Sequence, residues 1–164
     1  LLEAFGMLPA AVRQRVPLVL VGTPGWGGEH FWRSLVEHPM AAEVLVTGFV
    51  SDEQLAGVLA GACALLLPSR YEGFGLPILE AMAAGCPVAC SDIAAFREVA
   101  GSAAELVETE NHEAWARIMR RAAEDETWAA PLQRQGQVRA QGFSWEAVAR
   151  LHAQVIAAAA RQTC

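Results

Sequence analysis

Residues 63–91, CALLLPSRYEGFGLPILEAMAAGCPVACS, decide the fold. The stretch begins with an apolar run that ends at Pro68 and closes with a second apolar run over 87–91. Between them lies a helical pattern over 78–84, followed by Gly85, a residue that commonly ends a helix in the left-handed conformation. The order strand, turn, helix, strand predicts one unit of a parallel sheet, because a parallel connection needs a crossover.

The rest of the chain repeats this alternation. Further apolar runs predict strands over 16–22, 43–49 and 103–107, and the first of them has the composition of a strand buried on both faces. Helical patterns cover 28–37, 51–62 with Ser51 as the N-cap, 92–99 and, with breaks at Pro131 and Gly142, the chain after Glu108. Five strands alternating with helices predict an α/β fold with a doubly wound parallel sheet, which binds ligands at the carboxyl ends of its strands.

Composition excludes several classes of protein. The chain has 164 residues, 54% of them hydrophobic, which suits one domain with a sizeable core. Its net charge is −6, and all twelve basic residues are arginine, so it is a poor nucleic-acid binder. No apolar run reaches the ~20 residues that span a bilayer. The opening LLEAFGML lacks the basic start of a signal peptide and resembles the back half of a helix, which indicates a piece of a longer protein.

The cysteines do not predict a metal site. They lie at positions 63, 86, 90 and 164, and no histidine or second cysteine pair completes a set of four ligands. We therefore predict no metal, and buried, reduced thiols in a cytoplasmic protein.

The turn before the predicted helix has the composition of an anion site. Gly73 and Gly75 permit positive φ and a close approach to a ligand, and Pro77 suits the first position of a helix. The N–H groups of Phe74, Gly75 and Leu76 would then point, together with the positive end of the helix dipole, at one place. Such an arrangement binds pyrophosphate.

Two glutamates flank this turn. Glu72 precedes it, and Glu80 lies about one turn inside the helix, so its side chain points back toward the helix start. A carboxylate accepts hydrogen bonds from two vicinal hydroxyls, and hydroxyls on both sides of a diphosphate describe a nucleotide-sugar. The simpler alternatives are a solvated loop acid for Glu72 and a dipole-stabilising acid for Glu80.

Two more loops follow predicted strands. The loop GTPGWGGE at 22–29 matches neither a dinucleotide fingerprint nor a lysine-containing P-loop, and the alternative is a flexible loop with Trp26 as a lid or packing residue. In the second loop, the backbone of Gly48, Phe49 and Val50 could face a nucleotide base. An ordinary strand-to-helix turn is an equal alternative.

With these residues described, the stretch PSRYEGFGLPILEAMAAGCPVACSD at 68–92 resembles the E-x7-E signature region of retaining, family 4 (group 1) glycosyltransferases of the GT-B fold. The likeness covers nearly the whole chain. It includes VPLVLVGTPGW at 16–26, the segment 46–69, AAFREVAGSAAELVE at 94–108 and FSWEAVARLHAQV at 143–155.

The resemblance implies an architecture and an activity. Residues 1–164 would form a single Rossmann-like, C-terminal, nucleotide-sugar-binding domain that lacks its first strand and the N-terminal acceptor lobe. Residues 144–164 would be a helix that crosses to the missing lobe and here exposes an apolar face. The full-length enzyme would move a hexose to a glycan or lipid-linked acceptor in polysaccharide biosynthesis. It would do so with retention and without a metal or other cofactor, while the fragment alone would be inactive.

The resemblance also implies residue roles. Glu72 would be catalytic at the donor sugar, the turn 73–76 would bind the donor sugar and phosphate, Glu80 the ribose, and 48–50 the base. The loop with Gly25 and Trp26 is similar to mannosyltransferases, which makes GDP-mannose a candidate donor beside a UDP-sugar.

The chain departs from the family in its basic residues. The family's Arg and Lys pair would lie before residue 1, and Arg70 is a candidate substitute, a solvated loop arginine being the alternative. None of the four histidines matches a family motif, and Trp115, Trp128 and Trp145 are interpreted as packing residues. An epimerase or a non-catalytic nucleotide-sugar module on the same fold remains open. So does the location, either cytoplasmic or peripheral at the inner face of the membrane.

Overall fold

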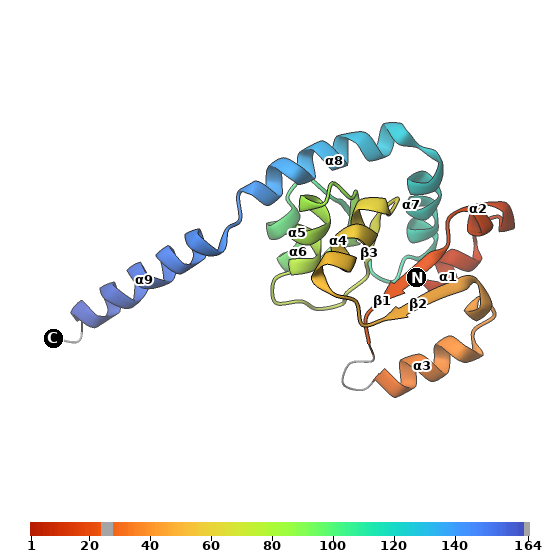
Figure 1. Ribbon diagram of the computed structural model, residues 1–164, viewed down its shortest axis with the longest axis horizontal. Helices are drawn as coiled ribbons and strands as arrows, with labels where there is room; N and C mark the ends of the chain where they lie inside the picture. Colours follow the sequence, from red (N-terminus) through yellow and green to blue (C-terminus); the bar gives the residue numbers. More distant parts are fainter. Residues whose placement is uncertain (24–27, 163–164) are drawn as a thin grey trace.

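The computed structural model describes residues 1–23 and 28–162, and it has an α/β architecture in which helices flank short parallel strands (Figure 1). The strands are β1 (Leu18–Val21), β2 (Val44–Gly48), β3 (Leu65–Leu67), β4 (Val88–Ser91) and β5 (Glu105–Val107). The helices are α1 (Leu2–Gly6), α2 (Ala10–Arg15), α3 (Gly28–Glu37), α4 (Asp52–Gly61), α5 (Leu76–Ala83), α6 (Ala94–Ala100), α7 (His112–Glu124), α8 (Glu126–Gln141) and α9 (Trp145–Gln162), with a 3₁₀ turn at Ala41–Glu43. The predicted α/β fold with parallel strands is confirmed, and Gly25 and Trp26 lie outside the described residues.

The strands form two sheets instead of one. β1 pairs with β2, with Leu18 opposite Val44, and β4 lies between β3 and β5 in a second sheet. Across the described part of the chain, no ladder joins β1 to β3. In a doubly wound sheet the strand at the reversal point pairs with both halves. Among the described residues, the two groups of strands thus share side-chain packing but no backbone ladder.

The central strand β4 matches its apolar sequence. All four of its residues are buried, as the run over 87–91 predicts. Val88 and Cys90 pack in a cluster with Ile78 of α5 and Phe96 of α6, while Ala89 packs in the cluster that contains Trp115 of α7. Alternate residues of β4 therefore serve the two cores on opposite faces of the sheet.

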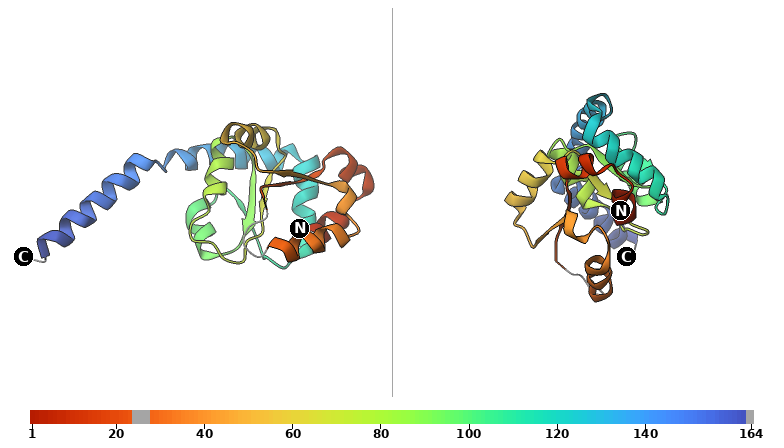
Figure 2. Two further views of the ribbon diagram at one scale, coloured as in Figure 1. Left: turned by 60° about the horizontal axis from the view of Figure 1, so that its bottom comes forward. Right: turned by 90° about the vertical axis from the view of Figure 1, so that its right-hand side faces the viewer.

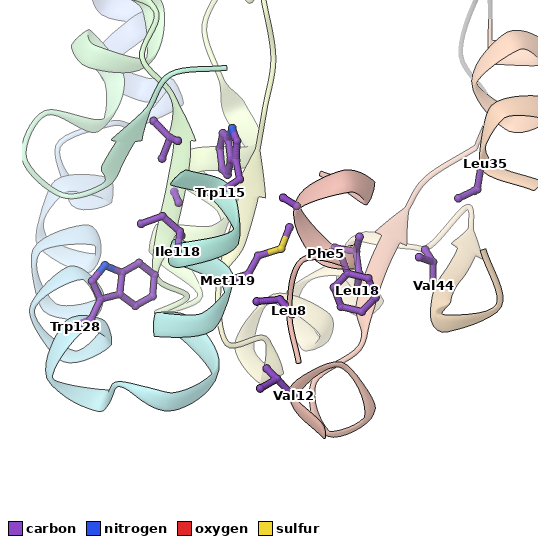
Figure 3. Packing of buried hydrophobic residues seen from close by; sticks show 13 residues of the cluster. Phe5, Leu8, Val12, Leu18, Leu35, Val44, Trp115, Ile118, Met119 and Trp128 are labelled. Carbon is purple, nitrogen blue, oxygen red and sulfur yellow. The ribbon is translucent and has the colours of Figure 1, made fainter. Parts of the chain in front are cut away.

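Side chains connect the two sheets. One core cluster contains Leu18 of β1 and Ala89 of β4, together with Phe5 of α1 and Met119 of α7. Figure 3 shows Met119 reaching from α7 toward Leu8 and Phe5. The contact of α1 with α7 thus holds the two sheets in one body.

The face of the smaller sheet that turns away from this cluster is open. Val19 and Val21 are 37% and 41% exposed, and Leu45 of β2 is 55% exposed. The prediction that the first strand is buried on both faces is therefore wrong. Its apolar composition is that of a covered strand, but the described residues cover one face only.

The helix ends follow local capping, with one correction. The Ser51 side chain accepts from the Gln54 N–H at the start of α4, in a capping box, as predicted for that N-cap. The predicted break at Pro131 is wrong, because Pro131 lies inside α8. The break lies at Asp125, whose carboxylate accepts the Trp128 N–H at 3.1 Å. The predicted break at Gly142 is confirmed.

The C-terminal helices bury two of three tryptophans. Trp115 and Trp128 are 1% and 5% exposed, as predicted, whereas Trp145 on α9 is 75% exposed, which corrects the packing role predicted for it. Figure 2 shows α9 extending away from the body. Its apolar face is exposed, as expected, at Val148, Leu151, Val155 and Ile156. Among the described helices, none has the length and apolarity needed to cross a membrane.

The thiols differ in burial. Cys86 and Cys90 are free and buried, as predicted, and burial raises the pKa of Cys86 to about 11 and that of Cys90 to about 12. Cys63 is exposed, so its predicted burial is wrong; it precedes β3 and is not part of the buried strand. Cys164 is outside the described residues. Within the described ranges, no three His, Cys, Asp or Glu side chains gather to hold a metal.

This difference predicts selective labelling of the thiols. In the native protein at pH 8, N-ethylmaleimide should modify Cys63 within minutes and spare Cys86 and Cys90. A thiol with a pKa of about 11 is only about 0.1% ionised at pH 8, and burial also blocks the reagent. Peptide mass spectrometry at timed intervals gives the rates. In guanidinium all three should react alike; labelling of native Cys86 as fast as Cys63 would contradict the burial.

Candidate functional site

The turn between β3 and α5 depends on one glycine. Gly75 is the N-cap of α5 with φ +109°, and a Cβ built on it would lie 2.9 Å from Cε1 of Phe96. Both facts exclude a larger side chain without strain. Gly73 differs: its φ is not positive and a Cβ there would meet nothing within 4 Å, so the expectation of positive φ at both glycines holds for Gly75 alone. Pro77 is the second residue of α5, one later than predicted.

The start of α5 leaves backbone donors free. No described residue accepts a hydrogen bond from the N–H groups of Phe74, Gly75 or Leu76, and no side chain caps the helix. The first bond of this turn runs from the Ile78 N–H to the Gly75 carbonyl, at 3.0 Å. Free N–H groups at the positive end of a helix attract an anion. The donors predicted from sequence are thus available for a ligand.

The two predicted acids have different surroundings. Glu72 is half-buried, and its Oε1 accepts a hydrogen bond from Ser69 Oγ at 3.0 Å. Glu80 is exposed on α5, and its carboxylate has no hydrogen bond or ion pair with any described side chain. Ser69 was missed by sequence reasoning, although the spacing Ser-x-x-Glu at a strand end could have indicated it. It holds one oxygen of Glu72 and leaves the other free to accept.

The predicted base-binding segment lies at the end of the other sheet. Gly48 ends β2 with φ +69°, and its carbonyl accepts from the Gly22 N–H at 3.0 Å. Phe49 is 81% exposed and Val50 is half-buried. Both this segment and the turn 73–76 follow carboxyl ends of parallel strands, but the strands belong to different sheets. The base-binding role of 48–50 therefore stays a prediction.

Arg70 is paired. Its Nε donates to Oε1 of Glu110 at 2.7 Å, which connects the loop after β3 to the loop after β5. The Arg70 guanidinium lowers the pKa of Glu110, and Glu110 raises that of Arg70. Sequence reasoning considered a solvated Arg70 and missed Glu110, because the pairing is not local. Both side chains are exposed, so the pair contributes little to stability.

Ser91 lies at the carboxyl end of β4, where a parallel sheet commonly binds its ligand. Its side chain is fully buried, and its Oγ has no hydrogen-bond partner among the described residues. A hydroxyl beneath the surface does not meet a ligand seated at the turn. Around the turn, the exposed residues include Gly73, Phe74, Leu76 and Glu80, while Glu72 is half-buried and Gly75 is buried.

Comparisons of the sequence with known proteins all point to one family. The model of the family described as Glycosyl transferases group 1 matches residues 1–141. The O-antigen chain mannosyltransferase B of Escherichia coli is 36% identical over 146 residues, which are 89% of this chain and 38% of that protein. The MMP alpha-(1->4)-mannosyltransferase of Mycolicibacterium hassiacum is 38% identical over 104 residues, 61% of this chain and 25% of that protein.

Solved structures agree on the fold. HepE of Anabaena in complex with UDP-glucose superposes with a TM-score of 0.82 at 20% identity, over 96% of this chain and 44% of that one. WaaG, a glycosyltransferase involved in lipopolysaccharide biosynthesis, gives a TM-score of 0.77 at 20% identity, over 94% of this chain and 42% of that one.

The chain therefore spans well under half the length of these relatives. Its helix-flanked parallel strands have the Rossmann-like arrangement of a GT-B lobe. On the match over 1–141, the chain belongs to the group 1 glycosyltransferase family.

Proposed function

We propose that this chain is the donor-binding lobe of a retaining glycosyltransferase that moves a hexose from a nucleotide-diphosphate sugar to a glycan or lipid-linked acceptor. The observation that carries the proposal is the start of α5, where three N–H groups lack a partner among the described residues at a glycine that tolerates no Cβ. Unpaired N–H groups at the start of a helix form a binding site for a diphosphate.

Different residues bind different parts of the donor. The N–H groups of 74–76 bind the diphosphate, and the free oxygen of Glu72 accepts from hydroxyls of the sugar at the catalytic end. Glu80, exposed on α5, accepts from the ribose hydroxyls. The backbone of 48–50 holds the base. No step needs a metal or other cofactor.

Three similar proteins bear on the choice of donor. The mannosyltransferases of Escherichia coli and Mycolicibacterium hassiacum favour a mannosyl donor such as GDP-mannose. The HepE complex with UDP-glucose favours a UDP-sugar. We therefore carry both donors into the binding experiment. The O-antigen relative supports polysaccharide synthesis, which we assign to the cytoplasm and its membrane face.

The remainder of the enzyme completes the site. We propose that a preceding strand fills the position between β1 and β3, which would bring 48–50 and 72–80 to one sheet edge. An acceptor lobe would cover the apolar face of α9. Closure of two lobes excludes the water that would otherwise hydrolyse the donor, so the single lobe should bind donor and transfer nothing.

The two acids should have separable effects on binding. In the full-length protein, Glu80→Ala should weaken the binding of UDP, GDP and their sugars alike, by roughly 10- to 150-fold, the contribution of one charge-assisted hydrogen bond. Glu72→Ala should weaken the binding of the sugar-bearing ligands only. Isothermal titration calorimetry with UDP, UDP-glucose, GDP and GDP-mannose measures both effects.

Glu113→Ala, an exposed acid in the first turn of α7, is the matched control and should change nothing. Wild-type affinity in both site variants would refute the roles of the two carboxylates. Absence of binding of any of the four ligands to the wild type would refute the proposed function.

Glycine is required at one position of the turn and not at its neighbour. Gly75→Ala should lower the free energy of unfolding by roughly 1–3 kcal/mol, because alanine is strained at positive φ; its Cβ would also meet Phe96. Gly73→Ala, which meets nothing, should stay within about 0.5 kcal/mol of wild type. Urea unfolding followed by circular dichroism compares the two. Equal stabilities would show that the Gly75 conformation is not needed.

A further inference from the structure

The junction between α8 and α9 contacts the turn of the candidate site. The ring of Phe143 lies edge-on against the ring of Phe74, with centroids 6.0 Å apart and planes at 76°. This is a favourable aromatic geometry. Phe74 is also one of the residues whose N–H group is free at the start of α5. A side chain between two C-terminal helices therefore supports the backbone of the turn.

Arg139 also contacts the Phe143 ring. Its guanidinium carbon lies 4.9 Å from the centroid of the Phe143 ring. The same guanidinium donates from Nε to the Val99 carbonyl at 2.8 Å and from Nη2 to the Glu98 carbonyl at 2.6 Å. Those carbonyls belong to the last turn of α6, where a cation is favourable. Arg139 is therefore fixed, and it limits where the Phe143 ring can lie.

The turn is thus held at two adjacent residues, and both contacts lead to α6. Gly75 packs directly on Phe96, in the middle of α6. Phe74 reaches the end of α6 through Phe143 and Arg139. A shift of Phe143 would release one of the two contacts and leave the other in place.

α9 departs from the body at this point. Gly142 is the C-cap of α8, and the Ser144 Oγ accepts the N–H of Ala147 at 3.1 Å in the first turn of α9. Figure 1 shows α9 leaving the body where α8 ends. Phe143 is therefore the ring-bearing residue between the two helices, and a change in the direction of α9 acts on it first.

We propose that Phe143 is a positioning residue that couples α9 to the turn 73–76. Its ring holds Phe74 so that the N–H groups of 74–76 point at one place, and the direction of α9 thereby alters the affinity of the turn for a diphosphate. Coupling of binding free energies is reciprocal, so a bound diphosphate also alters the surroundings of α9. The identity of the ligand rests on the proposed function, whereas the support of the turn by Phe143 does not.

The ligand-free part of the inference is tested by hydrogen–deuterium exchange on the full-length protein. In Phe143→Ala the Ile78 amide, which donates to the Gly75 carbonyl and so reports opening of the turn, should exchange roughly two- to tenfold faster, the effect of losing one aromatic pair. Phe143→Leu, which keeps apolar volume without a ring, should also exchange faster, and Phe143→Tyr should restore the wild-type rate. Val138→Ala, at an exposed position on α8, is the matched control and should leave the exchange rate of the Ile78 amide unchanged.

The ligand-dependent part uses UDP and GDP as probes. Whichever diphosphate binds the wild type should bind Phe143→Ala more weakly, by a similar factor. Phe143→Tyr should bind it with the wild-type affinity. Trp145, exposed in the first turn of α9, reports on the junction. Its emission, taken as the difference from a Trp145→Phe variant, should change with diphosphate in the wild type and not in Phe143→Ala.

The outcomes separate the two hypotheses. Unchanged exchange of the Ile78 amide in Phe143→Ala overturns the inference, whether or not a diphosphate binds. Faster exchange with unchanged diphosphate affinity and an unchanged Trp145 response overturns the coupling. Failure of the wild type to bind either UDP or GDP overturns the proposed function, while the exchange data still decide whether Phe143 supports the turn.

Discussion

Apolar side-chain packing between α1 and α7 keeps the structure in one body. In a continuous sheet, backbone hydrogen bonds from strand to strand would do this, but across the described residues no ladder joins β1 to β3. Instead, Phe5 and Met119 lie in a cluster that includes residues from both sheets. Packing of this kind is tight and non-directional, so it fixes separation more strongly than register. The relative placement of the two halves of the candidate site depends on it.

The second core cluster positions the chemistry. Phe96 is fully buried, and its ring sets how closely the Gly75 backbone approaches α6. Because the Phe96 ring lies so close, position 75 requires a glycine, and glycine can adopt the positive φ found there. In that conformation the N–H groups of 74–76 have no partner among the described residues. Arg139 and Phe143 act on the neighbouring residue. The turn is therefore shaped by nonlocal aromatic contacts, although its sequence looks like a local motif.

The sequence predicted what depends on local chemistry. The unit over 63–91, the Ser51 cap and the helix stop at Gly85 follow from periodicity and from single residues with strong conformational preferences. Sequence reasoning could not separate Gly75 from Gly73, because the difference comes from Phe96, about twenty residues later. The partner of Arg70 and the ring against Phe74 were missed for the same reason. The partner of Glu72, Ser69, is local, and its Ser-x-x-Glu spacing was overlooked. Burial of Trp145 and of the first strand was overpredicted, since apolar composition does not say whether a covering element is present.

The division of the strands also affects how the chain behaves in solution. β1 and β3 each have one edge whose N–H and C=O groups meet no other strand among the described residues. Such edges are templates for strands of other molecules and are a common origin of aggregation. Here the edges are short, four residues in β1 and three in β3, which limits the length of any intermolecular ladder. Expression of the lobe by itself would therefore gain solubility from an added strand that pairs with one of these edges.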